Sequence, residues 1–560
     1  MLEIGLLAVF AAVFLYLALG EPWEHTIQHA HPYSYLASDA YLHQAMAQYA
    51  KDSGRVKFAA PYSIGGYEES MDMHPPMLSQ ISASLSLMTG IEVYDTTMFS
   101  AASALLLAML AAYFIWRRGS KVIALIALPM MLLMLTGRLT ALTYWGYWLL
   151  LHGVMLLLAF FWALTHWEKK GMPFVVGVLL SAIALTHQPE MVFAGVFFVG
   201  FLLLKIWKEK AWKERKAAIV MVKKIAVVGI IFGILSFYSL LIFSKTYLLS
   251  EGYRNAWDPE ELRGGYPPFN PGDLGLFGII AILGVVGFFL IKKGKLWNPA
   301  SISLYSFLLG FSILIGLGKR GYAHRLFWFI YLSFFVGLAV YAALRIFLRN
   351  IHGAIPFGIS ILLIVLIVPT IYGNTKIGPG SMNPYDWEAL QWISRNIPQE
   401  GYVYYFYSDA LSHNAPIYSS KRIGFNIRLQ EYIQAIQSGK IQEKYTFGLA
   451  DGYTVYLHPL SPFSFCYYAH ELKPRNGSLE CLPNYQRYIK VSKEDEVKGI
   501  CDIQYYYFDK QASQPVLAQY NMAIREVLLK NDWIQEIYTN PLVSILQNEK
   551  PGDDCVAQSA

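Results

Sequence analysis

Charged residues are scarce in this chain. Only 15% of its 560 residues are Asp, Glu, Lys or Arg, whereas 55% are hydrophobic, and the mean hydropathy is +0.36. A soluble protein of this length needs far more polar surface to cover its core. The shortage of charge therefore excludes an ordinary soluble protein and predicts a polytopic α-helical membrane protein.

Cysteine is rarer still. The chain has four cysteines, Cys466, Cys481, Cys501 and Cys555, all in its last quarter. None has the CxxC spacing that is typical of zinc sites, so no structural zinc is expected. In an oxidising compartment, four cysteines pair most simply as two disulfides, and three connectivities stay open.

Long apolar runs, in contrast, are abundant. A helix needs about 17–20 apolar residues to cross the hydrocarbon core of a bilayer. We predict about eleven spans, at residues 4–20, 95–116, 121–137, 143–166, 172–187, 190–207, 222–244, 274–292, 298–318, 322–346 and 353–373. The third and fifth are the weakest. For residues 121–187, a helix pair that enters the membrane without crossing it stays open.

The basic residues predict how the chain is oriented. Cytoplasmic loops of membrane proteins are enriched in Lys and Arg beside the span ends. Compact basic clusters occupy alternate loops: Arg117, Arg118 and Lys121; Lys169 and Lys170; Lys205 to Lys224; Lys292, Lys293 and Lys295; Arg345 and Arg349. We therefore predict a multi-pass protein of the cell membrane, with a cytoplasmic N-terminus and its last domain outside. The net charge of +6 arises mostly from these clusters, and no nucleic-acid partner is expected.

This orientation gives the chain two domains. The membrane domain covers residues 1–373 and has external loops at about 21–94 and 245–273, and residues 374–560 form a soluble outside domain. In that domain, NPYDWEALQWISRN predicts a helix capped by Asn383, and YVYYFYS follows as a β-rich run. Near the end, NMAIREVLLKN predicts a helix, and WIQEIYT and LVSILQ predict a closing hairpin. We therefore expect an α/β fold there.

The first external loop holds the sharpest candidate site. Its sequence LASDAYLHQAMAQYAKDSG predicts a helix that begins at Ser38, with Asp39 in the first turn and His43 one turn later. A carboxylate in the first turn interacts favourably with the helix dipole, so Asp39 fits an ordinary helix end. Alternatively, Asp39 and His43 point together at a substrate, because residues at i and i+4 share one face. An exposed surface histidine is the ordinary alternative for His43.

A second helix is expected in the same loop, after the sequence MDMHPPM. Asp72 and His74 directly precede the two prolines that open this helix. A solvated acidic loop explains Asp72 and His74 as well as a binding site does. The apolar face of the helix predicts an amphipathic element that lies in the membrane interface. This face consists of Met77, Leu78, Ile81, Leu85 and Met88.

Further candidates lie at the predicted outer ends of spans. His187 and Glu190 occur in the sequence LTHQPE, where an acid at the membrane edge is costly unless it is used; a plain loop is the alternative. The sequence GKRGYAHR, after the ninth span, gathers positive charge against the positive-inside bias, which favours a phosphate site over contacts with lipid headgroups. The candidate phosphate ligands are Lys319, Arg320, His324 and Arg325, with Arg138 as a weaker addition.

These motifs resemble a known superfamily. An acid with a nearby His just after the first span, followed by the HPPM helix start and SLMTGI, is similar to the first external loop of GT-C membrane glycosyltransferases. The sequence DWEALQWISRNIPQEGYVYYFYSD is similar to the start of the outside domain in archaeal and eukaryotic oligosaccharyltransferase catalytic subunits. The resemblance implies the GT-C fold and suggests an archaeal source.

Two departures narrow what the resemblance implies. The oligosaccharyltransferase signature WWDYG, which reads the acceptor peptide, is replaced by FYSDALSH. The second external loop reads TGRLTALTYWGYW and has no acid where that family carries a paired-acid metal motif. Both absences argue against transfer onto Asn of a protein and against an obligatory cofactor. Mg²⁺ or Mn²⁺ stays open as an alternative, but no paired-acid motif supports it.

The resemblance then implies an inverting glycosyltransferase. A sugar would pass from a polyprenyl (dolichyl) phosphate donor to a glycan, lipid or protein acceptor at the outer face, with membrane lipids as the remaining partners. Such a reaction needs a general base, for which Asp39 is our choice, with His43 beside it. It also needs cations for the donor phosphate, the role expected for the GKRGYAHR cluster and Arg138. Asp72, His74, His187 and Glu190 are candidates for binding acceptor or sugar.

Two other function classes stay open. A transporter or flippase of lipid-linked saccharides would show internal repeats and ionisable groups at mid-membrane depth. No repeat is evident in this chain, and its ionisable residues gather at the predicted outer surface. A non-catalytic surface scaffold derived from the same fold is the third possibility. It would have no need of cations opposite an external acid.

Overall fold

We describe the protein from a computed structural model. The described residues are 1–33, 38–56, 70–71, 75–136, 146–209, 214–249, 275–291, 326–348, 351, 353–372, 382–398, 403–405, 446–448, 453–456, 472–475, 478–481, 487–490, 497–499, 501, 503–511, 515–553 and 555. Every structural statement below refers to these residues.

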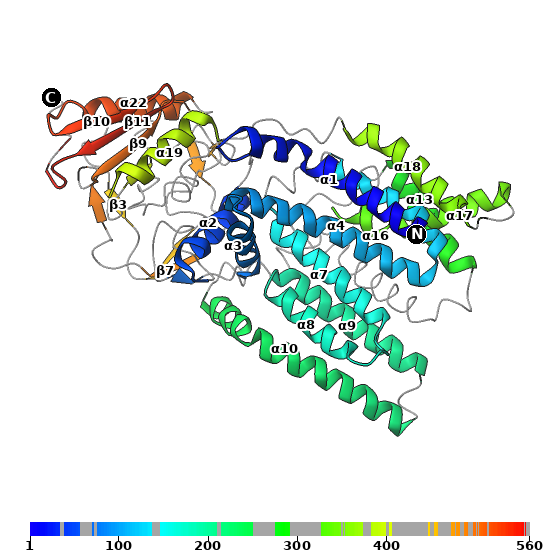
Figure 1. Ribbon diagram of the computed structural model, residues 1–560. Helices are drawn as coiled ribbons and strands as arrows, with labels where there is room; N and C mark the ends of the chain where they lie inside the picture. The colour runs from blue at the N-terminus through cyan, green and yellow to red at the C-terminus, as the bar shows by residue number, and fades with distance from the viewer. Residues whose placement is uncertain are drawn as a thin grey trace.

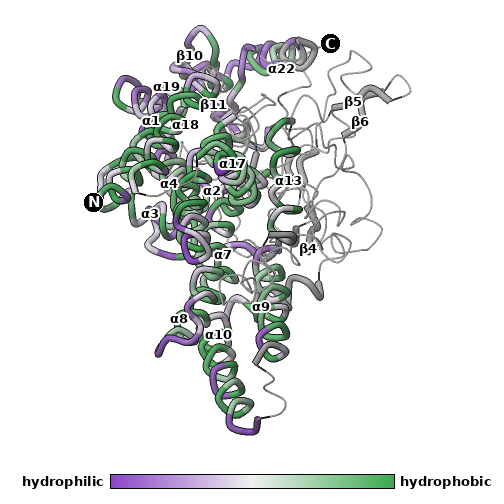
Figure 2. The backbone as a smooth tube through the Cα atoms, turned by 90° about the vertical axis from the view of Figure 1, so that its right-hand side faces the viewer, coloured by the Kyte–Doolittle hydropathy of each residue, from purple (hydrophilic) through white to green (hydrophobic). Residues whose placement is uncertain are grey.

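Apolar helices form a bundle at one end of the molecule, and a smaller α/β domain lies at the other end (Figure 1). Figure 2 shows the hydrophobic colour running along the bundle helices, with hydrophilic residues at helix ends. The bundle elements are α1 (Leu2–Gln28), α4 (Val93–Gly119), α5 (Lys121–Ala127), the 3₁₀ helix η2 (Leu128–Leu135), α7 (Trp148–Thr165), α8 (Met172–Ala184), α9 (Gln188–Glu209), α10 (Arg215–Leu249), α13 (Gly275–Ile291), α16 (Trp328–Tyr331), α17 (Ser333–Phe347) and α18 (Ile355–Tyr372).

Seven helices in the described part of the chain are long and apolar enough to cross a membrane. They correspond to predicted spans in α1, α4, α7, α9, α10, α16–α17 and α18. Three further predicted spans are present as shorter apolar helices, α5–η2, α8 and α13. The predicted span at 298–318 lies outside the described residues. A multi-pass helical membrane protein is therefore confirmed, whereas the count of eleven stays a prediction.

The two weakest predicted spans are shorter than the hydrocarbon core of a bilayer. The third is a seven-residue α-helix continued by an eight-residue 3₁₀ helix that begins at Leu128, just before Pro129. A 3₁₀ helix rises about 2.0 Å per residue against about 1.5 Å in an α-helix, so α5 and η2 together cover roughly 26 Å of a hydrocarbon core of roughly 30 Å. The fifth span, α8, has only 13 residues, or roughly 20 Å at the α-helical rise.

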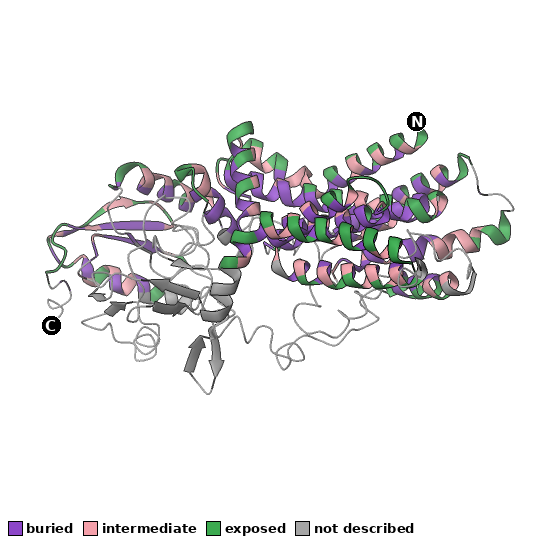
Figure 3. Ribbon diagram, turned by 90° about the horizontal axis from the view of Figure 1, so that it is seen from below, coloured by how far each residue is buried: buried purple, intermediate pink, exposed green. Residues whose placement is uncertain are grey.

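Glycines let the bundle helices approach one another closely. A Cβ added at Gly177 of α8 would lie 2.9 Å from the Cβ of Ile231 in α10. A Cβ at Gly337 of α17 would lie 2.8 Å from the Cβ of Ala127 in α5. Small residues of this kind are typical of helix contacts in membranes, where van der Waals packing replaces the hydrophobic effect between helices. Figure 3 shows the buried inner faces and the exposed outer faces of the bundle that result.

The bundle has two chemically different ends. We call the end where α4 and α7 finish the basic end, because the clusters at Arg117–Lys121 and Lys169–Lys170 lie there. At this end Glu3 of α1 pairs with Arg117, lies 2.8 Å from Lys121 Nζ, and accepts a 2.7 Å hydrogen bond from the Tyr113 hydroxyl. We call the opposite end, where α4 and α7 begin, the loop end. Which end faces the cytoplasm stays a prediction.

The terminal domain is built on a four-stranded sheet of order β10–β11–β9–β2. Its elements are α19 (Pro384–Asn396), β2 (Val403–Tyr405), β9 (Tyr505–Asp509), α22 (Pro515–Leu528), β10 (Ile534–Thr539) and β11 (Val543–Asn548). Strand β2 pairs parallel to β9, and the other two pairings are antiparallel. The predicted cap at Asn383 is confirmed, since its side chain accepts the Asp386 N–H at 3.0 Å. The predicted closing hairpin is β10–β11.

A disulfide joins the segment just before β9 to the segment after β11. It links Cys501 to Cys555, with a Cα–Cα distance of 5.4 Å. One of the two expected disulfides is therefore present. Cys466 lies outside the described residues, so the second disulfide stays a prediction.

Short strands pair residues of the first loop with residues of the terminal domain. Strand β1 (Ser70–Met71) pairs antiparallel with β7 (Arg487–Lys490), which pairs in turn with β4 (Tyr453–Tyr456). Two further two-stranded sheets join β3 (Thr446–Gly448) to β8 (Val497–Gly499) and β5 (Leu472–Arg475) to β6 (Ser478–Cys481). Tyr94 at the start of α4 also contacts Trp387 of α19, with ring centroids 5.7 Å apart. The first loop and the terminal domain thus lie together at the loop end.

Candidate functional site

Two helices of the first loop cover the loop end of the bundle. They are α2 (Ser38–Ser53) and α3 (Met77–Thr89), which pack against each other and against α4 (Figure 1). Of the predicted apolar face of α3, only Leu78 is buried, and Met88 keeps 82% of its surface exposed. The buried positions are mostly small: Ser79, Ser82, Ala83 and Ser86. Small side chains allow close packing, and the position of the apolar face in the membrane interface stays a prediction.

His43 is buried in the contact between α2 and the bundle. Its side chain is 5% exposed, and its ring centroid lies 6.2 Å from that of Trp148, the first residue of α7. The alternative of an exposed surface histidine is therefore wrong. Asp39 lies in the first turn of α2, four residues before His43, but its side chain lies outside the described part of the chain. Its role as a base stays a prediction.

Glu190 is a fully buried carboxylate at the same end of the bundle. Its exposure is 0%, and it forms an ion pair with His187, whose side chain keeps 23% of its surface exposed. Tyr331 of α16 also lies close enough to interact with its charge. The carboxylate accepts, so Nδ1 of His187 donates, which leaves Nε2 as the acceptor whenever the ring is neutral. Sequence alone gave His187 and Glu190 as candidates, and the structure brings them together.

The carboxylate of Glu190 packs against α7 at Gly153, which has no side chain. A Cβ added at Gly153 would lie 2.7 Å from Glu190 Oε2. One residue earlier, His152 is 4% exposed, and its Nδ1 lies 2.8 Å from the Trp148 carbonyl oxygen. A carbonyl only accepts, so this Nδ1 carries the hydrogen and Nε2 is the acceptor. Gly153 of α7, His187 just before α9 and Tyr331 of α16 therefore lie around one buried acid.

The motifs HPPM and LTHQPE meet at this place. The Met77 N–H at the start of α3 donates to the Leu185 carbonyl oxygen at 3.3 Å. The Thr186 hydroxyl lies 2.8 Å from Met77 Sδ. The second helix of the first loop thus begins on the connection between α8 and α9, directly before His187. Two motifs that are about 110 residues apart in the sequence belong to one site.

A second buried acid lies near the start of α4. Asp95 is 4% exposed and accepts a hydrogen bond from Thr26 near the end of α1. Its Oδ1 has no hydrogen-bond partner among the described residues. A carboxylate in the first turn of a helix interacts favourably with the helix dipole, which explains Asp95 without a substrate.

Sequence reasoning missed several of these residues. Trp148, His152, Gly153 and Tyr331 were not predicted, although His152 occurs within a predicted apolar span. An ionisable residue inside a span is a signal for function that could have found it. Gly153 and Tyr331 had no such signal, because their importance comes only from facing Glu190.

Other predicted site residues cannot be placed. Asp72, His74, Arg138, Lys319, Arg320, His324 and Arg325 lie outside the described residues. Among the residues that the structure does describe, no three His, Cys, Asp or Glu side chains are arranged to hold a metal ion. The phosphate site and the metal independence both stay predictions.

Solved structures with a similar fold are glycosyltransferases. The archaeal oligosaccharyltransferase AglB from Archaeoglobus fulgidus, in complex with an inhibitory peptide and a dolichol-phosphate, aligns with a TM-score of 0.50 and 13% identity over 75% of this chain. ArnT from Cupriavidus metallidurans, bound to undecaprenyl phosphate, aligns with a TM-score of 0.52 and 10% identity over 98% of both chains. The arabinofuranosyltransferase AftD from Mycobacteria aligns with a TM-score of 0.53 and 14% identity over 98% of this chain and 40% of its own.

The likeness lies in structure and not in sequence. No protein-family profile matches the chain. No curated protein matches its sequence. The chain spans 64% of the archaeal oligosaccharyltransferase, and at 10–14% identity the alignments establish the fold alone. The fold of this chain is that of the GT-C glycosyltransferases, as its sequence motifs had indicated.

Proposed function

We propose that this protein is a glycosyltransferase that moves a sugar from a polyprenyl-phosphate donor to an acceptor at the loop end of the bundle. The observation that carries the proposal is the meeting of α2 and α3 of the first loop with the buried His187–Glu190 pair. Burying an acid inside a membrane bundle is costly, so such acids usually serve a function. The GT-C fold indicates which function to test first. AglB and ArnT, solved with dolichol-phosphate and undecaprenyl phosphate, support a polyprenyl phosphate as the carrier.

The reaction needs a base on the acceptor side. In our proposal the Asp39 carboxylate takes the proton from the acceptor hydroxyl, and the oxygen attacks the anomeric carbon. The bond from that carbon to the phosphate oxygen breaks, and polyprenyl phosphate leaves with the electron pair. Attack on the face opposite the phosphate inverts the anomeric configuration. Loss of a general base typically slows such a step about 10²–10⁴-fold.

The departing phosphate needs positive charge. The proposed ligands are Lys319, Arg320, His324 and Arg325, with Arg138 as a further cation. Arg and Lys hold phosphate oxygens through charge-assisted hydrogen bonds. The proposal requires no divalent cation, so EDTA should leave the rate within about twofold; a loss of activity that Mg²⁺ or Mn²⁺ restores would overturn this part.

We propose that His187 binds a hydroxyl of the acceptor or the sugar. Glu190 would fix the imidazole so that Nε2 accepts from that hydroxyl. Glu190→Gln keeps the size and removes the charge, and it should raise KM for one substrate several-fold with a smaller change in kcat. An unchanged KM for donor and acceptor in a stable Glu190→Gln protein would show that the pair is only structural.

Product analysis tests the whole proposal. Purified protein is incubated with a panel of polyprenyl-phosphate-linked sugars and candidate glycan, lipid and peptide acceptors. A transferase consumes the donor and forms a new glycoside, which mass spectrometry identifies. A flippase moves the intact donor between leaflets of a vesicle and consumes none. A scaffold does neither.

A further inference from the structure

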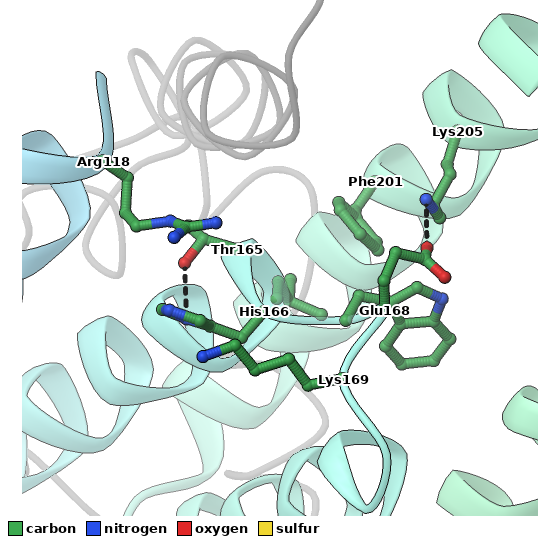
Figure 4. Close-up of a pocket in the computed structure, with 9 residues that line it drawn as sticks. Arg118, Thr165, His166, Glu168, Lys169, Phe201 and Lys205 are labelled. Atoms are coloured by element: carbon green, nitrogen blue, oxygen red, sulfur yellow. Dashed lines mark hydrogen bonds and ion pairs between the residues drawn. The ribbon is translucent and has the colours of Figure 1, made fainter. Parts of the chain in front are cut away.

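A cavity of about 100 Å³ lies at the basic end of the bundle. It is formed by the end of α4, the turn between α7 and α8, and one face of α9 (Figure 4). The residues that line it are Arg118, Leu164, Thr165, His166, Trp167, Glu168, Lys169, Phe201 and Lys205. Since Glu190 lies at the loop end, this cavity is no part of the proposed transferase site.

The one carboxylate in the cavity wall is already paired. Glu168 forms an ion pair with Lys205 of α9 and lies 2.6 Å from Lys224 Nζ of α10. Burial alone would raise the pKa of Glu168, but these two ammonium groups outweigh burial and lower the pKa below its ordinary value. Glu168 is therefore ionised at neutral pH, and its charge serves to hold α9 and α10 to the turn.

Two cations in the same wall are not paired. Within the described residues, the side chains of Arg118 and Lys169 have neither a hydrogen bond nor an ion pair. Figure 4 shows the Arg118 guanidinium and the Lys169 side chain near Thr165 and His166. Because Glu168 already pairs with Lys205 and Lys224, Arg118 and Lys169 leave an excess of positive charge in the described part of the cavity wall. A bound anion would neutralise this excess positive charge.

Part of the cavity wall is apolar, and tryptophan side chains lie at the same level of the bundle. Leu164, Trp167 and Phe201 are buried side chains of the wall. Trp162, one turn before His166, and Trp207, just beyond Lys205, are 36% and 55% exposed. Exposed Trp side chains concentrate at the membrane–water interface, the level of the lipid phosphates. A ligand that combines a phosphate with an apolar body fits this wall better than inorganic phosphate does.

We propose that this cavity binds the headgroup phosphate of an anionic membrane phospholipid. Arg118 forms two parallel hydrogen bonds to phosphate oxygens, and Lys169 supplies the second positive charge. The glycerol region of the lipid rests against Leu164 and Phe201. The bound lipid joins α4 to the α7–α8 turn at the basic end, where juxtamembrane cations attract anionic lipids.

The test measures lipid binding to the purified full-length chain in neutral detergent by native mass spectrometry. Short-chain phosphatidylglycerol is compared with phosphatidylcholine and with inorganic phosphate. The double variant Arg118→Gln and Lys169→Gln removes the two unpaired cations. Its matched control, Lys170→Gln and Lys223→Gln, removes two exposed cations at the same end that do not line the cavity.

We expect phosphatidylglycerol to bind at least about 10-fold more tightly than phosphatidylcholine, because the choline cation of phosphatidylcholine cancels the phosphate charge and is repelled by Arg118 and Lys169. The cavity variant should lose about 10–100-fold in affinity, and the control should stay within about twofold. Arg118→Lys keeps the charge without the paired hydrogen bonds and should lose affinity partly, so the result does not depend on one variant. Equal losses in the cavity variant and the control would overturn the proposal. Inorganic phosphate competing as well as the lipid does would also overturn it.

Discussion

Gly153 of α7 leaves room for the Glu190 carboxylate, which packs directly against it inside the bundle. Because a Cβ at Gly153 would lie 2.7 Å from Glu190 Oε2, Gly153→Ala must push the carboxylate away from its partners. Overpacking of this kind costs about 1–3 kcal/mol of stability. We expect the variant to melt at a lower temperature and to transfer sugar at least about 10-fold more slowly, since a small misplacement of reacting groups is costly.

Gly200→Ala is the matched control for this substitution. A Cβ at Gly200 of α9 would meet no heavy atom within 4 Å, and Ala is favoured over Gly in a helix by about 0.5–1 kcal/mol. Melting temperature and initial rate are measured for both variants. If Gly153→Ala and Gly200→Ala behave alike, the close fit of Gly153 to Glu190 has no role.

How far the sequence predicts individual residues depends on what makes them important. His43 was found because it shares a helix face with Asp39, and His187 and Glu190 because an acid at the edge of an apolar span is costly. Their burial could not be predicted, since it depends on how α2 and the α8–α9 connection dock on the start of α7. For the same reason, Gly153 could not be identified from the sequence. Its role follows only from the carboxylate that faces it.

At the scale of elements, local signals predicted the terminal domain well. The capped helix after Asn383 and the closing hairpin are confirmed. Strand β9, with the sequence YYYFD, was not predicted, although it is the buried strand between β11 and β2. Aromatic residues alone do not show which strand is central. For α3 the apolar positions predicted an amphipathic helix in the membrane interface, but they did not show that small residues, mostly serines, form its buried face.

The first turn of α19 gives a test of pH dependence. Burial raises the pKa of Asp386 to about 7, although hydrogen bonds from Asn383 and Tyr507 lower it in part. In the unfolded chain this carboxyl loses its proton near pH 3.8, its ordinary pKa. The folded state therefore holds one more proton between these two values. Its stability should fall as the pH rises through this window and level off above pH 7.

Asp386→Asn removes this titration and keeps the shape. We expect the melting temperature of the variant, relative to the parent, to be higher at pH 8 than at pH 5. Intrinsic tryptophan fluorescence reports the transition, since Trp387 and Trp392 lie in the same helix. A difference in melting temperature that stays constant from pH 5 to pH 8 would contradict the buried protonated carboxyl.

At the scale of the whole molecule, composition was enough to predict a membrane protein. The basic clusters predicted which loops lie together, and the structure places those at Arg117–Lys121 and Lys169–Lys170 at one end. The fold itself was suggested by short motifs in the first loop and the outside domain. The sequences of the spans contributed little to this fold prediction. Many different apolar sequences are compatible with the same helix packing, and this chain is only 10–14% identical to the known structures of similar fold.

Topology gives a direct test at this scale. A reporter tag after Ala560 should be accessible from outside intact cells, whereas a cysteine introduced at Gly171, in the turn between α7 and α8, should be labelled only after permeabilisation. The positive-inside bias gives the reason. Accessibility of both sites from the same side would contradict the proposed arrangement. A tag accessible only from the cytoplasm would place the candidate site on the wrong face.

Release of polyprenyl phosphate from a polyprenyl-phosphate-linked sugar is the most direct measurement of the central claim. Purified protein with an accepted donor and acceptor should release the lipid phosphate in step with glycoside formation. Asp39→Asn should slow this release about 10²–10⁴-fold. Its melting temperature should stay unchanged, because Asn serves a helix N-terminus about as well as Asp. A stable Asp39→Asn protein that releases polyprenyl phosphate at the parent rate would contradict the account.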